Sequence, residues 1–275
     1  MTYSTLCQLL KNAGIDSPEW DAAQLLQHFF QADILTLRTS PDTDYSSPDF
    51  DFAVQKRLAR EPLQYILGDW SFFRQTYEVS PDCLIPRSDT EILVEKAIQL
   101  LPQGAYFADL CTGSGCIAVS VLAERPDTNA IAVDKFEGTL SLATRNANRN
   151  GVSNRFTALC ADVLADDFFP SDVPLDAILS NPPYIQSDII STLSPEVQAE
   201  PRVALDGGKD GLLFYRSILQ HAERWLKPHG MVLLEIGYDQ GEAIRSLATT
   251  HGFANCQIFQ DLNALDRVVL LSKSF

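Results

Sequence analysis

The segment Asn181-Pro182-Pro183-Tyr184 carries the residue types best suited to chemistry in this chain. Two prolines fix φ, remove two backbone donors and push each preceding residue to an extended conformation, so the segment is a stiff ledge. The Asn181 side-chain oxygen and the Pro182 carbonyl are two acceptors that can hold both hydrogens of a planar NH₂ group. The Tyr184 ring can stack on the flat face of that group. The segment is therefore either a plain turn or a seat for a planar nitrogen.

The reaction expected at such a seat is transfer of a carbon to nitrogen. An amide nitrogen is a poor nucleophile because its lone pair is delocalised, and two acceptors weaken that delocalisation. Holding the nitrogen in line with a reactive carbon contributes more, up to ~7–11 kcal/mol. The methyl group of S-adenosylmethionine is such a carbon. No Ser-His-Asp, Cys-His or metal-binding set is apparent in the sequence, which favours direct in-line transfer over covalent or metal catalysis.

Three upstream segments have the residues that a nucleotide-like ligand needs. The loop Cys111-Thr112-Gly113-Ser114-Gly115 opens a helix, and its glycines allow positive φ and close backbone approach to a ligand. Asp134 follows Gly115 by nineteen residues, a spacing that suits hydrogen bonds to ribose hydroxyls, although an exposed strand-end aspartate is the alternative. Asp162 can bond the exocyclic amine of an adenine, and Val163 offers an apolar contact. These segments predict a site for an adenosine-containing ligand.

From about residue 104 the apolar pattern alternates between strands and helices, which predicts a mostly parallel sheet covered on both faces. The strands are expected at residues 105–110, 129–135, 155–162, 175–181, 231–237, 256–262 and 267–274. The helices are expected at residues 116–126, 138–151, 212–230 and 241–253. Ligands of such sheets bind outside the carboxyl ends of the strands, which is where the polar segments above fall.

The first part of the chain has a different pattern. Apolar residues recur at three- and four-residue spacing over 5–14, 18–31 and 47–61, as in amphipathic helices. We expect a helical domain at residues 1–70, a hairpin or extended connector at 71–86 and the α/β domain at 87–275. The helical domain has no catalytic-looking polar cluster, so it serves either as a scaffold or to grip a substrate.

Composition narrows the class of protein. The 275 residues are 45% hydrophobic, with no apolar run of about 18 residues, so no membrane span is expected. The first residues lack a signal-peptide pattern, and the six cysteines are scattered without a C-x-x-C, which is typical of a reduced cytoplasmic protein without a metal site. A formal net charge of −15 disfavours non-specific affinity for nucleic acid.

The residues also carry a family resemblance. "SNPPYI" resembles the signature of class I methyltransferases that modify the planar nitrogens of adenine, cytosine or glutamine. Five longer blocks are similar to the peptide chain release factor N5-glutamine methyltransferase family, at residues 61–73, 84–95, 109–120, 200–216 and 226–241. Cys111 stands where that family often has glycine. The resemblance implies a Rossmann-like, mostly parallel seven-stranded sheet with a small N-terminal all-helical domain.

The resemblance further implies a reaction and a partner. A methyl group would pass from S-adenosylmethionine to the glutamine of the Gly-Gly-Gln motif of peptide chain release factors, leaving S-adenosylhomocysteine. The helical domain would help to embrace the release factor. The enzyme is expected to be a monomer that binds neither nucleic acid nor a membrane.

The resemblance also assigns roles by position. Cys111 to Gly115 would wrap the methionine part of the cofactor, Asp134 would hold its ribose, and Asp162 with Val163 would border adenine. Asn181, Pro182, Pro183 and Tyr184 would seat the glutamine amide; Asn181, Pro182 and Tyr184 would be catalytic, and Asn181 would also border the cofactor. Three residues of the block at 84–95 would line the same pocket, although a structural salt bridge is equally expected for the first: Arg87, Thr90 and Glu91. The glycine-rich turn at 206–211 would cover the substrate or face solvent.

Other functions share parts of this pattern. A nucleic-acid adenine-N6 methyltransferase uses the same Asn-Pro-Pro-aromatic device, but it flips a base from a duplex and needs a basic surface. A ribosomal-protein glutamine methyltransferase has the same chemistry. A nicotinamide oxidoreductase would explain the glycine loop and Asp134, but it gives the residues at 181–184 no role. A non-catalytic cofactor-binding regulator also remains open.

Overall fold

The computed structural model describes residues 1–169 and 174–273. The chain forms two compact units, and each is described by itself. One comprises Met1–Asp69 with Leu193–Ala199, and the other comprises Trp70–Thr192 with Glu200–Phe275. Within the described residues, no helix is long and apolar enough to cross a membrane.

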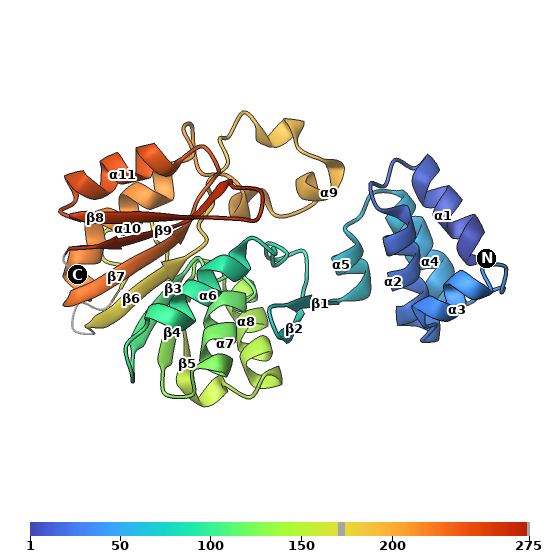
Figure 1. Ribbon diagram of the computed structural model, residues 1–275, viewed down its shortest axis with the longest axis horizontal. Helices are drawn as coiled ribbons and strands as arrows, with labels where there is room; N and C mark the ends of the chain where they lie inside the picture. Colours follow the sequence, from blue (N-terminus) through green and yellow to red (C-terminus); the bar gives the residue numbers. More distant parts are fainter. Residues whose placement is uncertain (170–173, 274–275) are drawn as a thin grey trace. The chain divides into compact units, whose positions relative to one another are not determined.

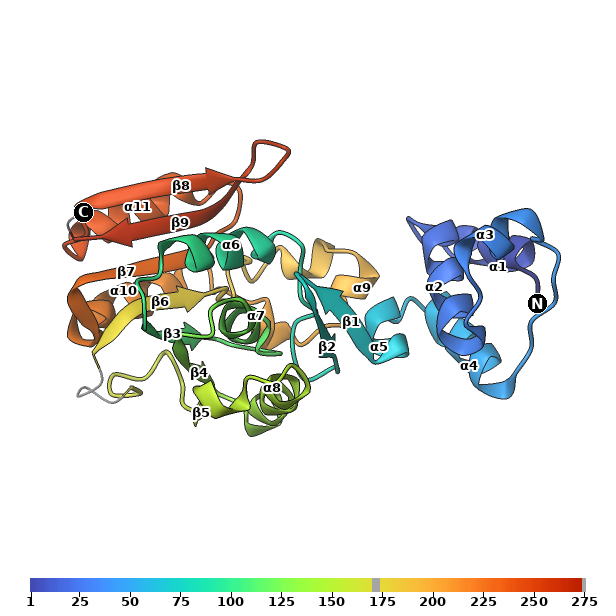
Figure 2. The same cartoon turned by 60° about the horizontal axis from the view of Figure 1, so that its bottom comes forward.

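The first unit is all helical, as the sequence pattern predicted. Its helices are α1 (Tyr3–Asn12), α2 (Pro18–Phe30), α3 (Ile34–Thr39), α4 (Pro48–Leu58), α5 (Leu63–Leu67) and α9 (Pro195–Gln198). Side-chain oxygens cap three of them, because the hydroxyls of Thr2 and Ser47 and the carboxylate of Asp33 accept first-turn backbone N–H groups. The apolar faces of α1, α2 and α4 pack together (Figures 1 and 2) around fully buried Leu6 and Phe50.

The second unit is built on a seven-stranded sheet of order β5-β4-β3-β6-β7-β9-β8. Its strands are β3 (Tyr106–Leu110), β4 (Asn129–Asp134), β5 (Phe156–Cys160), β6 (Leu175–Ser180), β7 (Leu226–Glu235), β8 (Asn255–Gln260) and β9 (Asp266–Ser272). Strands β3 to β7 pair in parallel, and β9 runs antiparallel to both β7 and β8. The predicted mostly parallel seven-stranded sheet is confirmed.

Helices cover both faces of this sheet (Figures 1 and 2). One face packs on α6 (Thr90–Leu100), α7 (Cys116–Glu124) and α8 (Glu137–Arg149), and the other on α10 (Leu213–Trp225) and α11 (Gly241–Thr250). Neighbouring residues of one strand join opposite layers, as Phe107 and Ala108 do. This two-sided burial explains why the strands read as continuous apolar runs. Helix α6 was not among the elements expected from the sequence.

The remaining elements are short. Strands β1 (Asp69–Phe72) and β2 (Gln75–Glu78) form a separate two-stranded sheet. Three 3₁₀ turns lie at Ser153–Arg155, Ile190–Thr192 and Arg202–Ala204.

The chain order places β3 at the switch point of the sheet. Strands β4 and β5 follow β3 to one side, whereas β6 and β7 lie on its other side. Loops leaving the carboxyl ends of β3, β4 and β6 therefore diverge and open a crevice between them, which is where ligands of doubly wound sheets bind.

A buried ion pair holds the first unit together. Arg57 donates from Nε to Asp21 Oδ2 at 2.6 Å and from Nη1 to Glu196 Oε1 at 3.0 Å. Arg60 binds the other Glu196 oxygen at 2.6 Å, so α9 is anchored to α4 and to the residues that follow it. The side chains of Asp21 and Arg57 are less than a tenth exposed, and burial raises the pKa of Asp21 while Arg57 opposes that rise.

We predict that Arg57→Met lowers the free energy of unfolding by about 3–5 kcal/mol, because Asp21 is left as a buried charge without its counterion. Adding Asp21→Asn to this variant removes the uncompensated charge and restores part of the loss. Urea unfolding followed by circular dichroism measures all three proteins. A double variant no more stable than Arg57→Met would contradict this account.

Candidate active site

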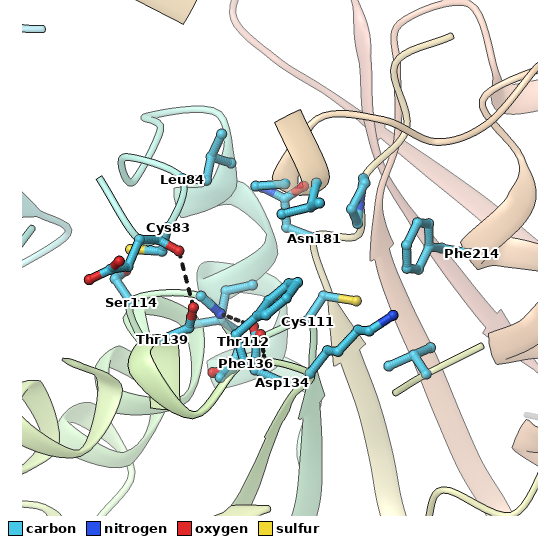
Figure 3. A pocket seen from close by; sticks show the side chains of 18 of the residues that line it. Cys83, Leu84, Cys111, Thr112, Ser114, Asp134, Phe136, Thr139, Asn181 and Phe214 are labelled. Carbon is cyan, nitrogen blue, oxygen red and sulfur yellow. Dashed lines mark hydrogen bonds between the residues drawn. The ribbon is translucent and has the colours of Figure 1, made fainter. Parts of the chain in front are cut away.

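A pocket of about 350 Å³ opens at the carboxyl ends of β3, β4 and β6. Figure 3 shows Asn181 and Phe214 beside the loops that carry Cys111 and Phe136. Nine of the residues assigned from the sequence line it: Cys111, Thr112, Gly113, Ser114, Asp134, Asp162, Val163, Asn181 and Pro183. Three others do not line it, namely Gly115, Pro182 and Tyr184.

A buried carboxylate shapes the glycine loop that follows β3. Asp109 is fully buried, and its Oδ2 accepts from Thr112 Oγ1 at 2.6 Å and from the Ala118 backbone N–H at 3.1 Å. Burial raises the pKa of Asp109 to about 7, although these two hydrogen bonds oppose the rise. Sequence reasoning gave Asp109 no role; an acid at the end of a buried strand was the available signal.

The backbone of this loop turns through the left-handed region. Cys111, Gly113 and Gly115 have φ of 59°, 56° and 80°. A Cβ on Gly115 would lie 3.1 Å from Ala143 Cβ, so a glycine lets α7 and α8 approach each other. Cys111 adopts the same region despite its side chain, which costs of order 1–3 kcal/mol. Its thiol has a pKa raised well above the usual value by burial.

Asp134 ties two loops together at the end of β4. Its Oδ2 accepts from Gly113 N at 3.1 Å, and its Oδ1 accepts from Phe136 N at 3.2 Å. Burial raises the pKa of Asp134, and backbone N–H groups oppose the rise. The carboxylate thus holds the glycine loop from inside the pocket.

Asp162 meets a lysine that sequence reasoning missed. Its Oδ2 lies 2.8 Å from Lys135 Nζ, and its Oδ1 accepts from Leu164 N at 3.0 Å. Burial would raise the pKa of Asp162, but Lys135 and the hydrogen bond from Leu164 N together outweigh that effect and lower it. Phe136 and Phe214 add aromatic surface to the pocket. An aromatic residue two positions after a strand-end acid could have pointed to Phe136.

The Asn181 side chain is oriented by one hydrogen bond. Its Nδ2 donates to Thr90 Oγ1 at 3.1 Å. Among the residues that the structure describes, none donates to Asn181 Oδ1 or to the Pro182 carbonyl. Both acceptors assigned from the sequence are thus available to a ligand. The Tyr184 hydroxyl donates to Glu235 Oε1 at 3.2 Å, and its ring packs against the core beneath α10.

Comparison with known proteins identifies the family. Residues 3–68 match the PrmC N-terminal domain, and residues 88–199 match the Methyltransferase small domain. A release factor glutamine methyltransferase from Thermodesulfovibrio yellowstonii is 37% identical over 262 residues, covering 92% of this chain and 92% of that protein. Another from Geobacter sulfurreducens is 43% identical over 218 residues, covering 78% of this chain and 75% of that protein. This chain belongs to the release factor glutamine methyltransferase family.

A solved structure supports the fold. A methyltransferase from Pyrococcus furiosus aligns with a TM-score of 0.56 and 18% identity, over 80% of this chain and 98% of that one. The family expected from the residues of the sequence is confirmed, and so is its fold. The chain is a methyltransferase of the S-adenosylmethionine-dependent class.

In this member of the release factor glutamine methyltransferase family, part of the block at residues 84–95 lines the pocket. Arg87 lines the pocket and also forms an ion pair with Glu200, so both alternatives for it apply. Glu200 is buried and accepts from Ile85 N at 3.0 Å as well. Thr90 lines the pocket, whereas Glu91 accepts from Phe73 N at 2.8 Å and does not line it.

The glycine-rich turn at residues 206–211 packs on the Asn-Pro-Pro-Tyr ledge. Gly207 N donates to Ile185 O at 2.8 Å, and Ile185 N donates to Leu205 O at 3.0 Å. A Cβ on Gly207 would lie 2.7 Å from Tyr184 Cα and 2.8 Å from Pro183 O. A glycine is therefore required for this close approach of two backbones. Beyond the ledge, Lys209 and Asp210 are exposed.

We predict that Gly207→Ala lowers the free energy of unfolding by about 1–3 kcal/mol, because the new Cβ forces the ledge and the turn apart. Gly138→Ala is the matched control, since nothing lies within 4 Å of its added Cβ in the exposed first turn of α8. That control should be as stable as the parent or more so. Thermal and urea unfolding measure the stability of both variants and the parent. If Gly207→Ala is as stable as Gly138→Ala, the turn accommodates the added methyl group and the prediction is wrong.

Proposed function

We propose that this chain transfers a methyl group from S-adenosylmethionine to the side-chain nitrogen of the glutamine in the Gly-Gly-Gln motif of peptide chain release factors. The observation that carries the proposal is the pair of free acceptors, Asn181 Oδ1 and the Pro182 carbonyl, on a rigid ledge beside a nucleotide-sized pocket. Family membership supports the choice of protein substrate.

The residues of the pocket suit S-adenosylmethionine. The glycine loop offers close backbone approach to the methionine part, and Asp134 has a carboxylate that can accept from ribose hydroxyls. Asp162 with Val163 would border the adenine, and Phe136 offers a flat apolar face. When bound, the cofactor supplies a methyl group on a sulfonium, which is an electrophile that needs no metal or covalent intermediate.

The ledge at residues 181–184 would orient the glutamine amide. Asn181 Oδ1 and the Pro182 carbonyl would accept the two hydrogens of the glutamine amide and turn its nitrogen toward the pocket. Because Pro182 and Pro183 fix their φ angles, the two acceptors are held without a large entropic cost. Tyr184 would support the ledge from the core side, because its hydroxyl donates to Glu235 and its ring packs against the core. Orientation of this kind contributes up to ~7–11 kcal/mol to a reaction between bound partners.

We further propose that the helical domain, residues 1–70, contacts the release factor, with residues 71–86 as a connector and 87–275 as the catalytic domain. Four large apolar side chains of the helical unit are exposed, which is the surface chemistry of a protein partner: Trp20, Ile34, Leu35 and Phe52. The net charge of −15 favours a protein substrate over a nucleic acid.

We predict that the purified chain labels one glutamine in a full-length release factor when given labelled S-adenosylmethionine. Four substrates are compared: the release factor, the same factor with its Gly-Gly-Gln glutamine changed, a ribosomal protein and duplex DNA. Mass spectrometry maps the product. Label on the ribosomal protein or on DNA, and none on the release factor, would overturn the proposal in favour of the corresponding alternative.

We predict that Asn181→Ala lowers kcat by about 10²-fold or more, because the amide loses an oriented partner in the transition state. Affinity for S-adenosylmethionine, measured by titration calorimetry, should change little. Equal losses in kcat and in cofactor affinity would instead assign Asn181 to cofactor binding. Retained turnover would remove it from the reaction.

A further inference from the structure

Asn181 is one end of a hydrogen-bond chain that joins the ends of strands β6 and β7 to the start of helix α6. Its Nδ2 donates to Thr90 Oγ1 at 3.1 Å, and Thr90 Oγ1 donates to Glu235 Oε2 at 2.5 Å. The Tyr184 hydroxyl donates to the other oxygen, Glu235 Oε1, at 3.2 Å. Thr90 and Glu235 are each 1% exposed, so the hydrogen bond between them is shielded from water.

The register of the sheet brings these groups together. Ser180 of β6 pairs with Leu234 of β7, so the residues that follow, Asn181 and Glu235, leave neighbouring strands at the same level. Thr90 is the first residue of α6 and reaches both of them. None of the three is close to another in the sequence.

The chemistry of the three groups sets the direction of every bond. An ionised carboxylate only accepts hydrogen bonds, so the Thr90 hydroxyl must donate its one hydrogen to Glu235. The Thr90 oxygen is then left as an acceptor, which binds the NH₂ end of Asn181 and not its oxygen. Asn181 Oδ1 consequently points away from Thr90 and stays unpaired among the described residues.

We propose that Thr90 and Glu235 are positioning residues that hold the Asn181 amide in the orientation that presents Oδ1 to the substrate nitrogen. The proposal rests on the proposed function for the identity of that nitrogen, but the hydrogen-bond chain itself does not. A flipped amide would present NH₂ to the NH₂ of the substrate, and two donors repel each other.

Protonation of Glu235 would release this constraint. A protonated carboxyl group donates one hydrogen bond, so Thr90 could turn its own proton toward Asn181 and allow the amide to flip. Burial raises the pKa of Glu235 to about 7, and the hydrogen bonds from Thr90 and Tyr184 oppose that rise. As pH falls below this value, the fraction of correctly oriented Asn181 should fall.

Other charged and titratable groups surround Glu235. Asp89, next to Thr90, raises its pKa, and Arg267 of β9 lowers it. Arg267 Nε lies 3.2 Å from Asp89 Oδ2 and 2.9 Å from Asp261 Oδ2, so its charge is shared. Tyr215 of α10 donates to the Glu235 backbone carbonyl at 2.9 Å, and the pKa values of both Tyr215 and Tyr184 are raised by burial. The pKa values of Arg267 and of both tyrosines lie far above 7, so these three groups keep their protons as pH falls through 7, whereas Glu235 gains one there.

The first test compares Thr90→Val, Thr90→Ser and Thr128→Val. The valine at 90 keeps the shape and removes the hydroxyl, and we expect kcat to fall about 10- to 100-fold with little change in cofactor affinity. The serine keeps the hydroxyl and should recover most of the lost rate. Thr128 is a buried threonine outside the pocket, whose hydroxyl donates to Arg125 O at 2.9 Å, so Thr128→Val controls for loss of a buried hydroxyl.

The second test is the pH profile of kcat for the parent and Glu235→Gln. The parent should lose activity as pH falls through about 7. Glu235→Gln has no proton to gain there, so its kcat should be low and flat across the same range. A variant that keeps the acid limb of the parent would assign that limb to another group and overturn the role of Glu235.

The third test needs no methyl transfer. The side-chain NH₂ signals of Asn181 in ¹⁵N-labelled protein, assigned by their loss in Asn181→Ala, should exchange slowly with solvent in the parent and in Thr90→Ser. They should exchange faster in Thr90→Val. Equal exchange in all three overturns the hydrogen-bond chain, whatever the substrate is. A parent protein that shows this exchange pattern but methylates no glutamine would overturn the proposed function and support the hydrogen-bond chain. If the parent is active and Thr90→Val has the same kcat, only the positioning role is overturned.

Discussion

Parallel pairing of β3 with both β4 and β6 sets the level of every loop in the pocket. Leu110 pairs with Val133 on one side and with Ser180 on the other. The residues that follow each strand therefore emerge at one edge of the sheet. A slip of one residue would turn every side chain of a strand to the opposite face, and both faces are packed, so the register is strongly determined.

Two buried carboxylates fix the positions of the loops and side chains at this edge of the sheet. Asp109 holds the glycine loop, and Glu235 holds the hydroxyls of Thr90 and Tyr184. Burial raises the pKa of each to about 7, which is the sign of a carboxyl group placed where its charge is poorly solvated. Each nevertheless makes two hydrogen bonds. Buried acceptors of this kind stabilise one arrangement of donors against others.

The ledge at 181–184 depends on residues that have no chemistry of their own. The prolines keep its backbone extended, and Gly207 lets the turn at 206–211 pack against it at backbone distance. The same turn contributes Asp206 and Gly208 to the pocket wall. The contact between these two loops therefore fixes both the ledge and this part of the pocket wall.

The sequence by itself determined the alternation of strands and helices, the helical N-terminal unit and the family, because these depend on local periodicity and short motifs. It also indicated the loop at 111–115, Asp134 and Asn181, since residues after strand ends must meet at one edge of a parallel sheet. Helix α6 was missed although its buried residues recur at helical spacing, at Thr90, Leu93, Val94 and Ala97. Only the tertiary structure decided the partners: Lys135 for Asp162, α9 for the first unit, and Glu235 for a threonine 145 residues away in the chain. The physical reason is that a hydrogen bond between distant residues depends on strand register and packing, and neither leaves a pattern along the sequence.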